Sequence, residues 1–217
     1  QGETLAILGK TGSGKSTVLD LIGRLYDIEN GSIKVDSIEI NQVNLNSLRE
    51  RIGYVPQDAF LFSDTIKNNI KFGLVNASED DVIEAAKNAV VHKNIVKFNK
   101  GYDTVLGERG ITLSGGQKQR VSIARAIIKN PKLLLLDDCL SAVDTETEEK
   151  ILKNLSKVSK NNTTIIVSHR ISSAKNADKI IVLDGGIVTQ KGTHDELVNI
   201  DGYYKELYLN QLSETSN

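Results

Sequence analysis

Two adjacent aspartates, Asp137 and Asp138, come directly after a run of four leucines at residues 133–136. An apolar run of this kind is typical of a strand that is buried on both faces of a parallel sheet. Carboxylates at the end of such a strand can hold a metal ion or accept a proton. The pair therefore predicts a metal ligand beside a catalytic base, provided that the second aspartate has the reach that a base needs.

A glycine-rich stretch, GKTGSGKST at residues 9–17, lies between a β-rich run and the helical pattern VLDLIGRLY. This is the P-loop pattern G-x-x-x-x-G-K-[ST] in its strand–loop–helix context. Glycines let backbone N–H groups approach phosphate oxygens, and the dipole of the following helix adds to the attraction. Lys15 is expected to reach the β- and γ-phosphates, and the Ser16 hydroxyl to ligate Mg²⁺. The predicted nucleotide contacts are Gly9, Lys10, Thr11, Gly12, Ser13, Gly14, Lys15, Ser16 and Thr17.

A second stretch, ITLSGGQKQRVSIARAIIKNP at residues 111–131, reads as the start and body of a helix. Ser114 stands at the N-cap position and Pro131 follows the helix. The two glycines after Ser114 leave backbone N–H groups uncovered, so an anion could dock at this helix start. Without further context, the pattern is equally typical of an ordinary capped helix.

The string LSGGQ followed by KQRVSIARAI resembles the signature motif of ATP-binding cassette (ABC) ATPases, and the resemblance covers essentially all 217 residues. In this family the signature of one cassette binds the nucleotide that is held by the P-loop of another, so two cassettes form two composite sites. The resemblance implies ATP and Mg²⁺ as cofactors. It also implies that ATP is contacted across the dimer by Ser114, Gly115, Gly116 and Gln117.

Four further strings match family motifs in order along the chain. YVPQ places Gln57 as the Q-loop glutamine, which touches Mg²⁺ and the attacking water. LLLLD resembles Walker B, so Asp137 would hold Mg²⁺, largely through water. SAVD, residues 141–144, resembles the D-loop that crosses to the partner cassette, and IIVSHR places His169 as the switch histidine at the γ-phosphate. Considered singly, such a glutamine is usually a surface residue and such a histidine more often structural than catalytic; their order and spacing favour function.

Asp138 stands where family members that hydrolyse ATP usually carry the glutamate that acts as general base. The basicities of Asp and Glu differ little, but Asp is shorter by one C–C bond, about 1.5 Å. A misplacement on the order of 1 Å can cost about a hundredfold in rate. We therefore expect a slow, mostly ATP-holding site, similar to one half of bacterial heterodimeric multidrug exporters. Because His169 is retained, slow hydrolysis of ATP at this site remains possible.

Short β-rich runs alternate with helical patterns, which predicts an α/β fold with a mostly parallel sheet. The expected strands are residues 4–8, 32–35, 52–56, 133–137 and 163–168, with a hairpin of 179–184 and 187–192. A helical insertion is expected at 65–99, and a C-terminal helix that frays by Ser213. The resemblance implies a single domain, residues 1–217, with a P-loop core (1–57 and 127–217) and a helical subdomain (58–126) carrying the signature.

Composition narrows the classes of partner. The net charge is −1, so no basic excess is available to neutralise a phosphate backbone, and we expect no nucleic-acid partner. Cys139 is the only cysteine, which excludes an internal disulfide and favours a reducing compartment. No apolar run approaches the roughly 18 residues needed to span a bilayer, and we expect no signal peptide within this segment. It also lacks methionine, so we expect a piece of a longer protein, in which the family's N-terminal β-strands and its adenine-stacking aromatic are truncated.

Two strings are similar to exporter-type cassettes: TVLGERG at residues 104–110 and QDAFLFSDTIKNNIKFG at 57–73. The resemblance then implies an ATPase that powers export from the cytoplasmic face of a membrane. Its partners would be a transmembrane domain of the same transporter and a second cassette, in a heterodimer or a homodimer. Two alternatives stay open: a mainly regulatory ATP-binding module, favoured by Asp138, and a soluble ABC ATPase, which GERG disfavours. The transported substrate is not readable from this segment.

Overall fold

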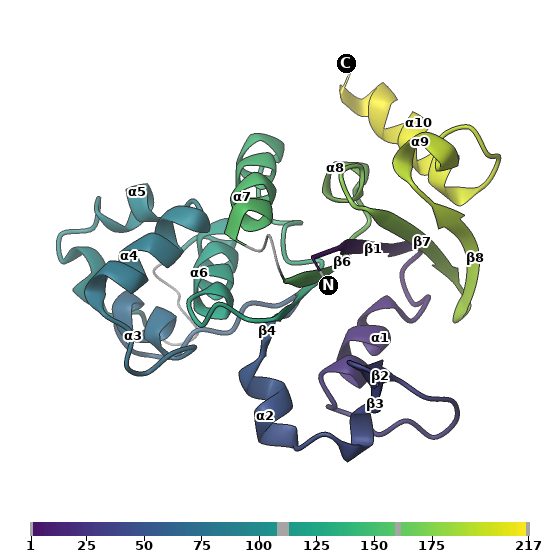
Figure 1. Ribbon diagram of the computed structural model, residues 1–217. Coiled ribbons are helices and arrows are strands. Elements are labelled where there is room, and N and C mark those ends of the chain that lie inside the picture. The colour runs from purple at the N-terminus through teal and green to yellow at the C-terminus, as the bar shows by residue number, and fades with distance from the viewer. Residues whose placement is uncertain (1, 108–112, 159–161, 216–217) are drawn as a thin grey trace.

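The computed structural model describes residues 2–107, 113–158 and 162–215, and its centre is a six-stranded sheet (Figure 1). The strand order is β4-β5-β6-β1-β7-β8. All neighbouring strands run parallel except the β7–β8 hairpin. Their bounds are β1 (Thr4–Gly9), β4 (Ile52–Val55), β5 (Leu133–Asp137), β6 (Thr163–Val167), β7 (Lys179–Asp184) and β8 (Ile187–Gly192). The α/β fold with a mostly parallel sheet is confirmed.

The stretch at 32–35 differs from its prediction as a strand of the main sheet. Only β2 (Lys34–Val35) forms there, and it pairs with β3 (Ile38–Glu39) in a separate two-stranded sheet. The two residues between them, Asp36 and Ser37, have φ of +49° and +70°. Two successive positive φ values are the geometry of a tight hairpin turn whose twist suits two antiparallel strands. The segment therefore folds back on itself and does not join the main sheet.

The leucine run of β5 lies between β4 and β6 and is buried on both faces. Leu135 packs with Leu19 of α1 (Lys15–Ile22) on one face of the sheet. Leu134 and Leu136 pack on the other face with residues of α6 (Gly115–Ile127). This alternation follows from the two-residue period of a strand. It places α1 and α6 on opposite faces of the sheet.

Parallel pairing also brings three strand ends to one edge of the sheet. Asp137 at the end of β5 is in register with Val167 at the end of β6, and Val167 is in register with Ile7 of β1. The segments that follow these strands therefore start side by side, because parallel strands end at a common edge. That edge carries the glycine-rich loop, Asp138 and His169.

Helices cover both faces of the sheet and form a body at one side (Figure 1). Helix α3 (Ile66–Lys71) and helix α4 (Glu79–Asn88) pack on α6, next to α5 (His92–Ile95). The expected helical insertion is thus present, and its buried side chains are continuous with those of β5. The domain division at 57/58 and 126/127 stays a prediction.

The remaining elements complete the two faces and the C-terminal part. Helix α2 (Leu45–Glu50) and the short η1 (Ile40–Gln42) lie with β2 and β3, below the sheet in Figure 1, and η2 (Gly101–Asp103) contacts α3. The chain then adds α7 (Thr145–Val158), α8 (Ile171–Ala174), α9 (His194–Leu197) and α10 (Tyr203–Thr215). Helix α10 extends past the expected fraying point at Ser213. Across the described ranges, no helix is both long and apolar enough to cross a membrane.

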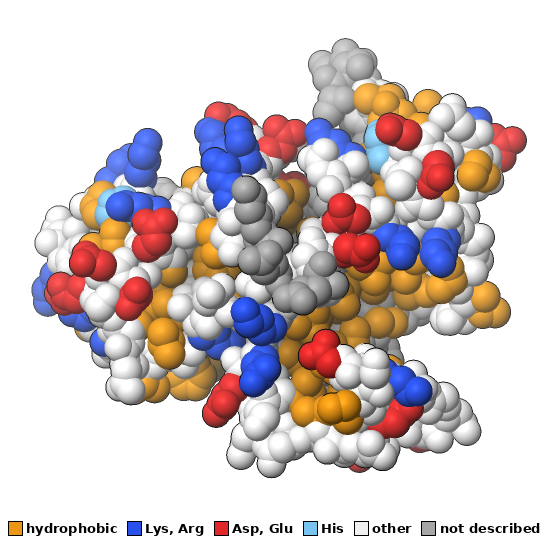
Figure 2. Space-filling model, viewed as in Figure 1, with side chains coloured by type: hydrophobic (Ala, Val, Ile, Leu, Met, Phe, Trp, Pro, Cys, Tyr) orange, Lys and Arg blue, Asp and Glu red, His pale blue; other side chains and the backbone are white. Residues whose placement is uncertain are grey.

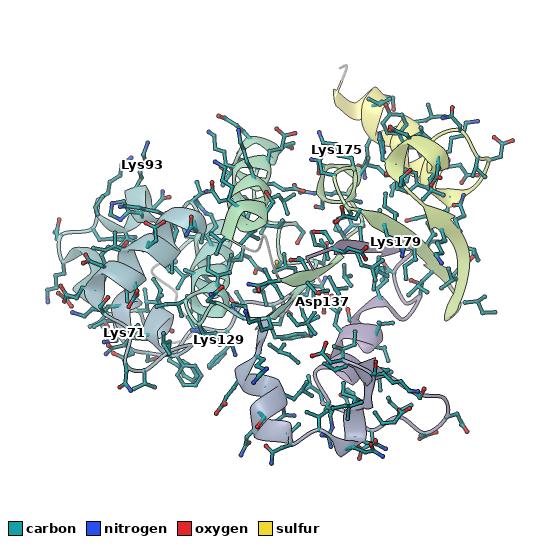
Figure 3. The ribbon with its side chains drawn as sticks, viewed as in Figure 1. Lys71, Lys93, Lys129, Asp137, Lys175 and Lys179 are labelled. Atoms are coloured by element: carbon teal, nitrogen blue, oxygen red, sulfur yellow. The ribbon has the colours of Figure 1, made fainter. Side chains whose placement is uncertain are left out.

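Charged side chains of both signs are interspersed on the face drawn in Figure 2, and apolar side chains show between the sheet and the part that contains α1 and β2. Among the labelled residues in Figure 3, Asp137 lies at the centre of the molecule, whereas Lys71 and Lys93 belong to the helical body at one side. Asp137 is 5% exposed. The fold therefore places a carboxylate from the end of β5 in its interior, which needs a local chemical reason.

Candidate functional site

The loop from β1 to α1 forms an open helix start. Gly14, the N-cap of α1, has φ +94° and offers no side chain to cap the helix. The first N–H groups of a helix have no partner within it, so those of α1 stay available to an anion. At the other end of the loop, a Cβ on Gly9 would lie 2.2 Å from the Leu183 carbonyl oxygen. That close approach of β7 requires glycine at position 9.

Two groups of the loop are suited to an anion. The Lys15 ammonium donates to the carbonyl oxygens of Gly9 and Lys10, each at 2.8 Å, and so lies over the loop. Burial lowers the pKa of Lys15, an effect that Asp138 and Asp137 oppose. The buried Ser13 hydroxyl has no hydrogen-bond partner among the described residues. An unused donor beside an ammonium and free backbone N–H groups fits a phosphate chain, and Lys10, Thr11, Gly12 and Thr17 are exposed around it.

Ser16 and Asp137 meet at the start of α1. The Ser16 hydroxyl donates to Asp137 Oδ1 at 2.9 Å. Burial raises the pKa of the Asp137 carboxyl, while the hydrogen bond from Ser16 acts in the opposite direction. No group of three or more His, Cys, Asp or Glu side chains that could hold a metal is found among the described residues. A hydroxyl and a single carboxylate suit Mg²⁺, which takes its other ligands from phosphates and water.

Asp138 and His169 form a second pair at the same edge, with Asp138 Oδ1 and His169 Nδ1 2.9 Å apart. Burial raises the pKa of Asp138, and the neighbouring His169 and Lys15 partly offset this. Asp138 has φ +43° and its backbone N–H donates to the Val167 carbonyl oxygen at 2.9 Å. The carboxylate is 13% exposed and the imidazole 53% exposed. The histidine is therefore the more accessible member of this pair.

Gln57, expected at the metal, follows β4 and is exposed. Its carbonyl oxygen accepts a hydrogen bond from Gln119 Nε2 of α6, which links this loop to the helical body. No hydrogen bond joins the Gln57 side chain to Ser16 or Asp137 among those of the described residues. The structure thus brings Lys15, Ser16 and the two aspartates together without this glutamine.

The residues of LSGGQ lie away from the loop of the same chain. Ser114 caps α6 as expected, in a reciprocal pair with Gln117: Ser114 N–H donates to Gln117 Oε1 at 3.0 Å, and Gln117 N–H to Ser114 Oγ at 3.3 Å. Ser114 and Gly115 are exposed, and a Cβ on Gly116 would lie 2.8 Å from the Ala142 carbonyl oxygen. Residues 108–112, which include the last three residues of GERG and the first two of the segment 111–131, lie outside the described residues.

Arg170 is a residue of this region that the sequence reasoning missed. Its guanidinium donates to carbonyl oxygens of the loop after Asp138 and to a buried carboxylate, Glu148 of α7. The position directly after His169 was the only available signal. Cys139, in contrast, is buried in the apolar cluster, and burial raises its pKa.

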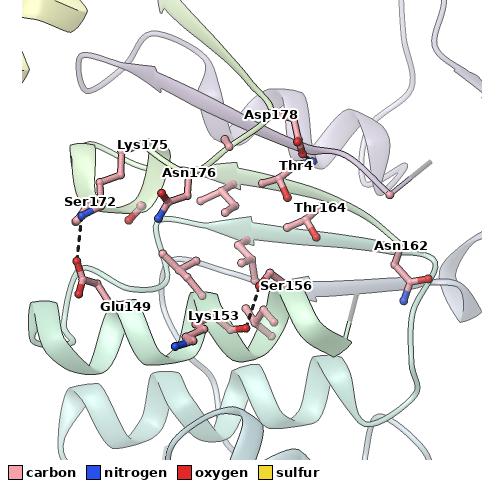
Figure 4. Close-up of a pocket in the computed structure, with 17 residues that line it drawn as sticks. Thr4, Glu149, Lys153, Ser156, Asn162, Thr164, Ser172, Lys175, Asn176 and Asp178 are labelled. Carbon is pink, nitrogen blue, oxygen red and sulfur yellow. Dashed lines mark hydrogen bonds and ion pairs between the residues drawn. The ribbon is translucent and has the colours of Figure 1, made fainter. Parts of the chain in front are cut away.

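A cavity of about 660 Å³ lies elsewhere, between α7, α8 and the strands β1 and β6 (Figure 4). Thr4, Thr164 and Lys153 line it, and Lys175 pairs with Glu149 at 3.0 Å beside it. None of the residues predicted to do chemistry is among its lining residues. The chemistry-bearing residues are instead arranged along the open edge of the sheet.

Comparisons with known proteins identify the family. A sequence model described as "ABC transporter" matches residues 1–141. The chain is 50% identical over 212 residues to ATP-binding cassette sub-family B member 6 of Xenopus tropicalis, covering 98% of this chain and 25% of that protein. It is 53% identical over 207 residues to the uncharacterized ABC transporter ATP-binding protein YknU of Bacillus subtilis, covering 95% and 35%.

A solved structure, described as a bacterial Atm1-family ABC exporter with ATP bound, superposes with a TM-score of 0.94 at 46% identity. The match covers 97% of this chain and 37% of that one. The chain therefore spans about a quarter to a third of the length of these relatives. It belongs to the ABC transporter family, as an ATP-binding domain of the exporter type.

Proposed function

We propose that this chain binds ATP with Mg²⁺ and hydrolyses it to drive export by a membrane transporter. The observation that carries the proposal is the meeting of three groups at one edge of the sheet: the open start of α1, the Ser16–Asp137 pair and the Asp138–His169 pair. Together they supply an anion cradle, a Mg²⁺ position and a polar pair for water activation.

In this proposal each group of the site has one task. Lys15 exchanges the carbonyl oxygens of Gly9 and Lys10 for phosphate oxygens, and the open N–H groups of α1 hold the same chain of phosphates. Ser16 and Asp137 would hold Mg²⁺, which when bound would neutralise negative charge on the phosphate oxygens. Gln57 completes the site when the helical body moves, since its carbonyl is tied to Gln119 of α6.

Asp138 takes the proton of the attacking water, and His169 holds the carboxylate and faces the γ-phosphate. The raised pKa makes the carboxylate a stronger base than an ordinary aspartate. Its shorter reach lowers the rate, so this site is the slow one of a pair. A mainly regulatory ATP-binding module is the second candidate, and the observation that favours it is the same short carboxylate held by His169.

A second cassette supplies the signature for this ATP, and this chain's signature serves the partner. The support is geometric: α1 and α6 pack on opposite faces of the sheet, while Ser114 and Gly115 at the start of α6 are exposed. Asp138 favours a heterodimer, because a slow site can be tolerated where the other site is fast. A homodimer is the alternative.

The transmembrane domain docks beside the Gln57 loop, which would place this chain at the cytoplasmic face of a membrane. Support comes from three aromatic side chains, Phe60, Phe62 and Phe72, which are 52%, 38% and 63% exposed. Arg125 lies over the rings of Phe62 and Phe72, 5.4 and 5.7 Å from their centroids. An apolar helix end could pack on this cluster while the same residues stay linked to α6 through Arg125.

The test uses the full-length transporter that contains this cassette, in lipid vesicles, with ATP affinity and phosphate release measured separately. Lys15→Ala should abolish ATP binding, because it removes the ammonium from the phosphate site. Lys97→Ala, a change at an exposed lysine of the helical body, is the matched control and should have no effect. Unchanged ATP affinity in Lys15→Ala would refute the site, and ATP binding without phosphate release in the wild type would favour the regulatory module.

A further inference from the structure

Arg170, which directly follows His169, donates several hydrogen bonds to one short backbone segment. Its Nη2 donates to the Ser141 carbonyl oxygen at 2.7 Å, and its Nη1 to that of Val143 at 3.0 Å and of Leu140 at 3.5 Å. These carbonyls belong to one loop, residues 140–143, which we call the crossing loop. Arg170, in the segment that follows β6, is therefore hydrogen-bonded to the backbone of the crossing loop through its guanidinium.

A buried carboxylate holds the Arg170 guanidinium in place. Glu148 of α7 is fully buried, and its Oε2 accepts from Arg170 Nη1 at 3.1 Å. Its Oε1 accepts from the hydroxyls of Ser172, at 2.9 Å, and Ser173. A buried charge is tolerated when it is paired and its remaining lone pairs are satisfied, as they are here. Both amino groups of Arg170 are thus fixed in direction by the planar guanidinium.

These contacts lie close in sequence to the Asp138–His169 pair. Asp138 precedes the crossing loop by two residues, and the Ser141 hydroxyl donates back to the Asp138 carbonyl oxygen at 2.9 Å. His169 directly precedes Arg170, and its ring meets Asp138 at 2.9 Å. Any shift of the crossing loop relative to Arg170 therefore changes the position of the aspartate relative to the histidine.

The crossing loop also reaches the start of α6. The Ala142 carbonyl oxygen lies so close to Gly116 that a Cβ there would be 2.8 Å away. The loop thus has Arg170 and Glu148 on one side and the LSGGQ helix on the other. Its conformation is set jointly by the segment after β6 and by the signature.

We propose that Arg170 is a positioning residue that holds the crossing loop in register with His169, and so keeps Asp138 and the signature helix in fixed relative positions. This inference rests on the proposed hydrolysis at Asp138 for its effect on rate, but not for its effect on the loop. Arg170 touches none of the residues proposed to hold the phosphates, so its role is in turnover and not in ATP affinity.

The test compares Arg170→Lys with Lys175→Ala in the full-length transporter. Lysine keeps a positive charge beside buried Glu148, so the fold is retained, but it lacks the planar fork that serves several carbonyls at once. Lys175→Ala is the matched control, because Lys175 joins α8 to Glu149 of α7 at 3.0 Å without contacting the crossing loop. Both variants are checked for an unchanged melting transition.

The first measurement is amide hydrogen exchange without nucleotide. In Arg170→Lys the amides of Ser141 and Val143, which donate to the carbonyl oxygens of Asp138 and Leu140, should exchange at least about tenfold faster, since hydrogen bonds to a charged donor are among the stronger ones. Residues 9–17 should exchange as in the wild type, and Lys175→Ala should leave the crossing loop unchanged. Equal exchange of the loop in wild type and Arg170→Lys would overturn the proposal, as would equal acceleration in both variants.

The second measurement separates turnover from binding. With the partner cassette's own site inactivated, phosphate release at saturating ATP should fall about tenfold in Arg170→Lys, with the Kd of a fluorescent ATP analogue unchanged within about twofold. A rise in Kd that accounts for the whole loss would overturn the positioning role. If the wild type binds ATP and releases no phosphate, the proposed hydrolysis fails, and the exchange measurement still decides the role of Arg170.

Discussion

Replacing Asp138 by glutamate tests whether reach limits this site. The change adds one methylene, which advances the carboxylate by about 1.5 Å. In the present geometry the aspartate lies 2.9 Å from His169 Nδ1 and is only 13% exposed. An advance of about 1.5 Å is about half of that distance, so it changes where the carboxylate lies relative to His169. If misplacement by about 1 Å costs about a hundredfold in rate, Asp138→Glu lowers the activation barrier by up to about 2.7 kcal/mol.

The same substitution has an opposing effect on stability. Asp138 has φ +43°, a left-handed conformation in which aspartate is several-fold more frequent than most residues. A several-fold preference corresponds to roughly 1 kcal/mol of folding stability, so the melting temperature of Asp138→Glu should be slightly lower than that of the wild type. The predicted signature is therefore faster turnover in a slightly less stable protein. A general gain in rigidity would raise both quantities.

The assay is phosphate release at saturating ATP from a full-length transporter whose partner cassette carries an inactivated site, so that release reports this site alone, with the melting temperature measured in the same samples. Asp184→Glu adds the same methylene at the exposed end of β7 and should change neither quantity. Asp138→Asn removes the base and should abolish release at this site. The reach argument is refuted if Asp138→Glu matches the wild type while Asp138→Asn is inactive.

Further predictions concern the same edge of the sheet. Phosphate release should decline as pH falls, and at a higher pH than for an ordinary carboxyl, because burial raises the pKa of Asp138 and protonation removes the base; a pH–rate profile measures this. Gly116→Ala should lower the free energy of unfolding by about 1–3 kcal/mol, since its Cβ would be 2.8 Å from the Ala142 carbonyl oxygen. Gly115→Ala, with its nearest atom at 3.9 Å, should cost nothing in urea titrations. The Cys139 thiol is 1% exposed with a raised pKa, so alkylation should require unfolding, and rapid labelling of the native protein would contradict its burial.

Those parts of the fold with a strong local cause were predictable from sequence. The bounds of β5 match the prediction, because four leucines can only be buried together in a strand that is covered on both faces. The β7–β8 hairpin also matches, since Gly185 and Gly186 both adopt positive φ. The turn at Asp36 was missed for the converse reason. Its residues adopt the same region without being glycine, so no composition signal marks the fold-back.

The candidate site was predictable from sequence only where strands that end at the same edge of the sheet bring motif residues into direct contact. Ser16 and Asp137 were expected to share one ion, and their side chains meet at 2.9 Å because β1 and β5 end at the same edge. Gln57 and the signature lie on segments whose positions relative to that edge depend on the helical body. A single chain brings neither of them to the phosphate-binding loop, so their predicted roles depend on closure and on a partner.

Arg170 could not be predicted as a functional residue from the sequence, because of the groups with which it bonds. Three of its four acceptors are backbone carbonyl oxygens, and a carbonyl carries no sequence signature because every residue has one. Only Glu148, a buried acid on an otherwise charged helix, could have pointed to it, and burial is known only from the packed structure. Sequence motifs identify side chains that contact a ligand. A side chain such as Arg170, which positions those residues, instead bonds to backbone atoms that every residue has. We therefore expect the rate at Asp138 to depend on contacts that a motif search does not detect, and substitutions at Arg170 should reveal them.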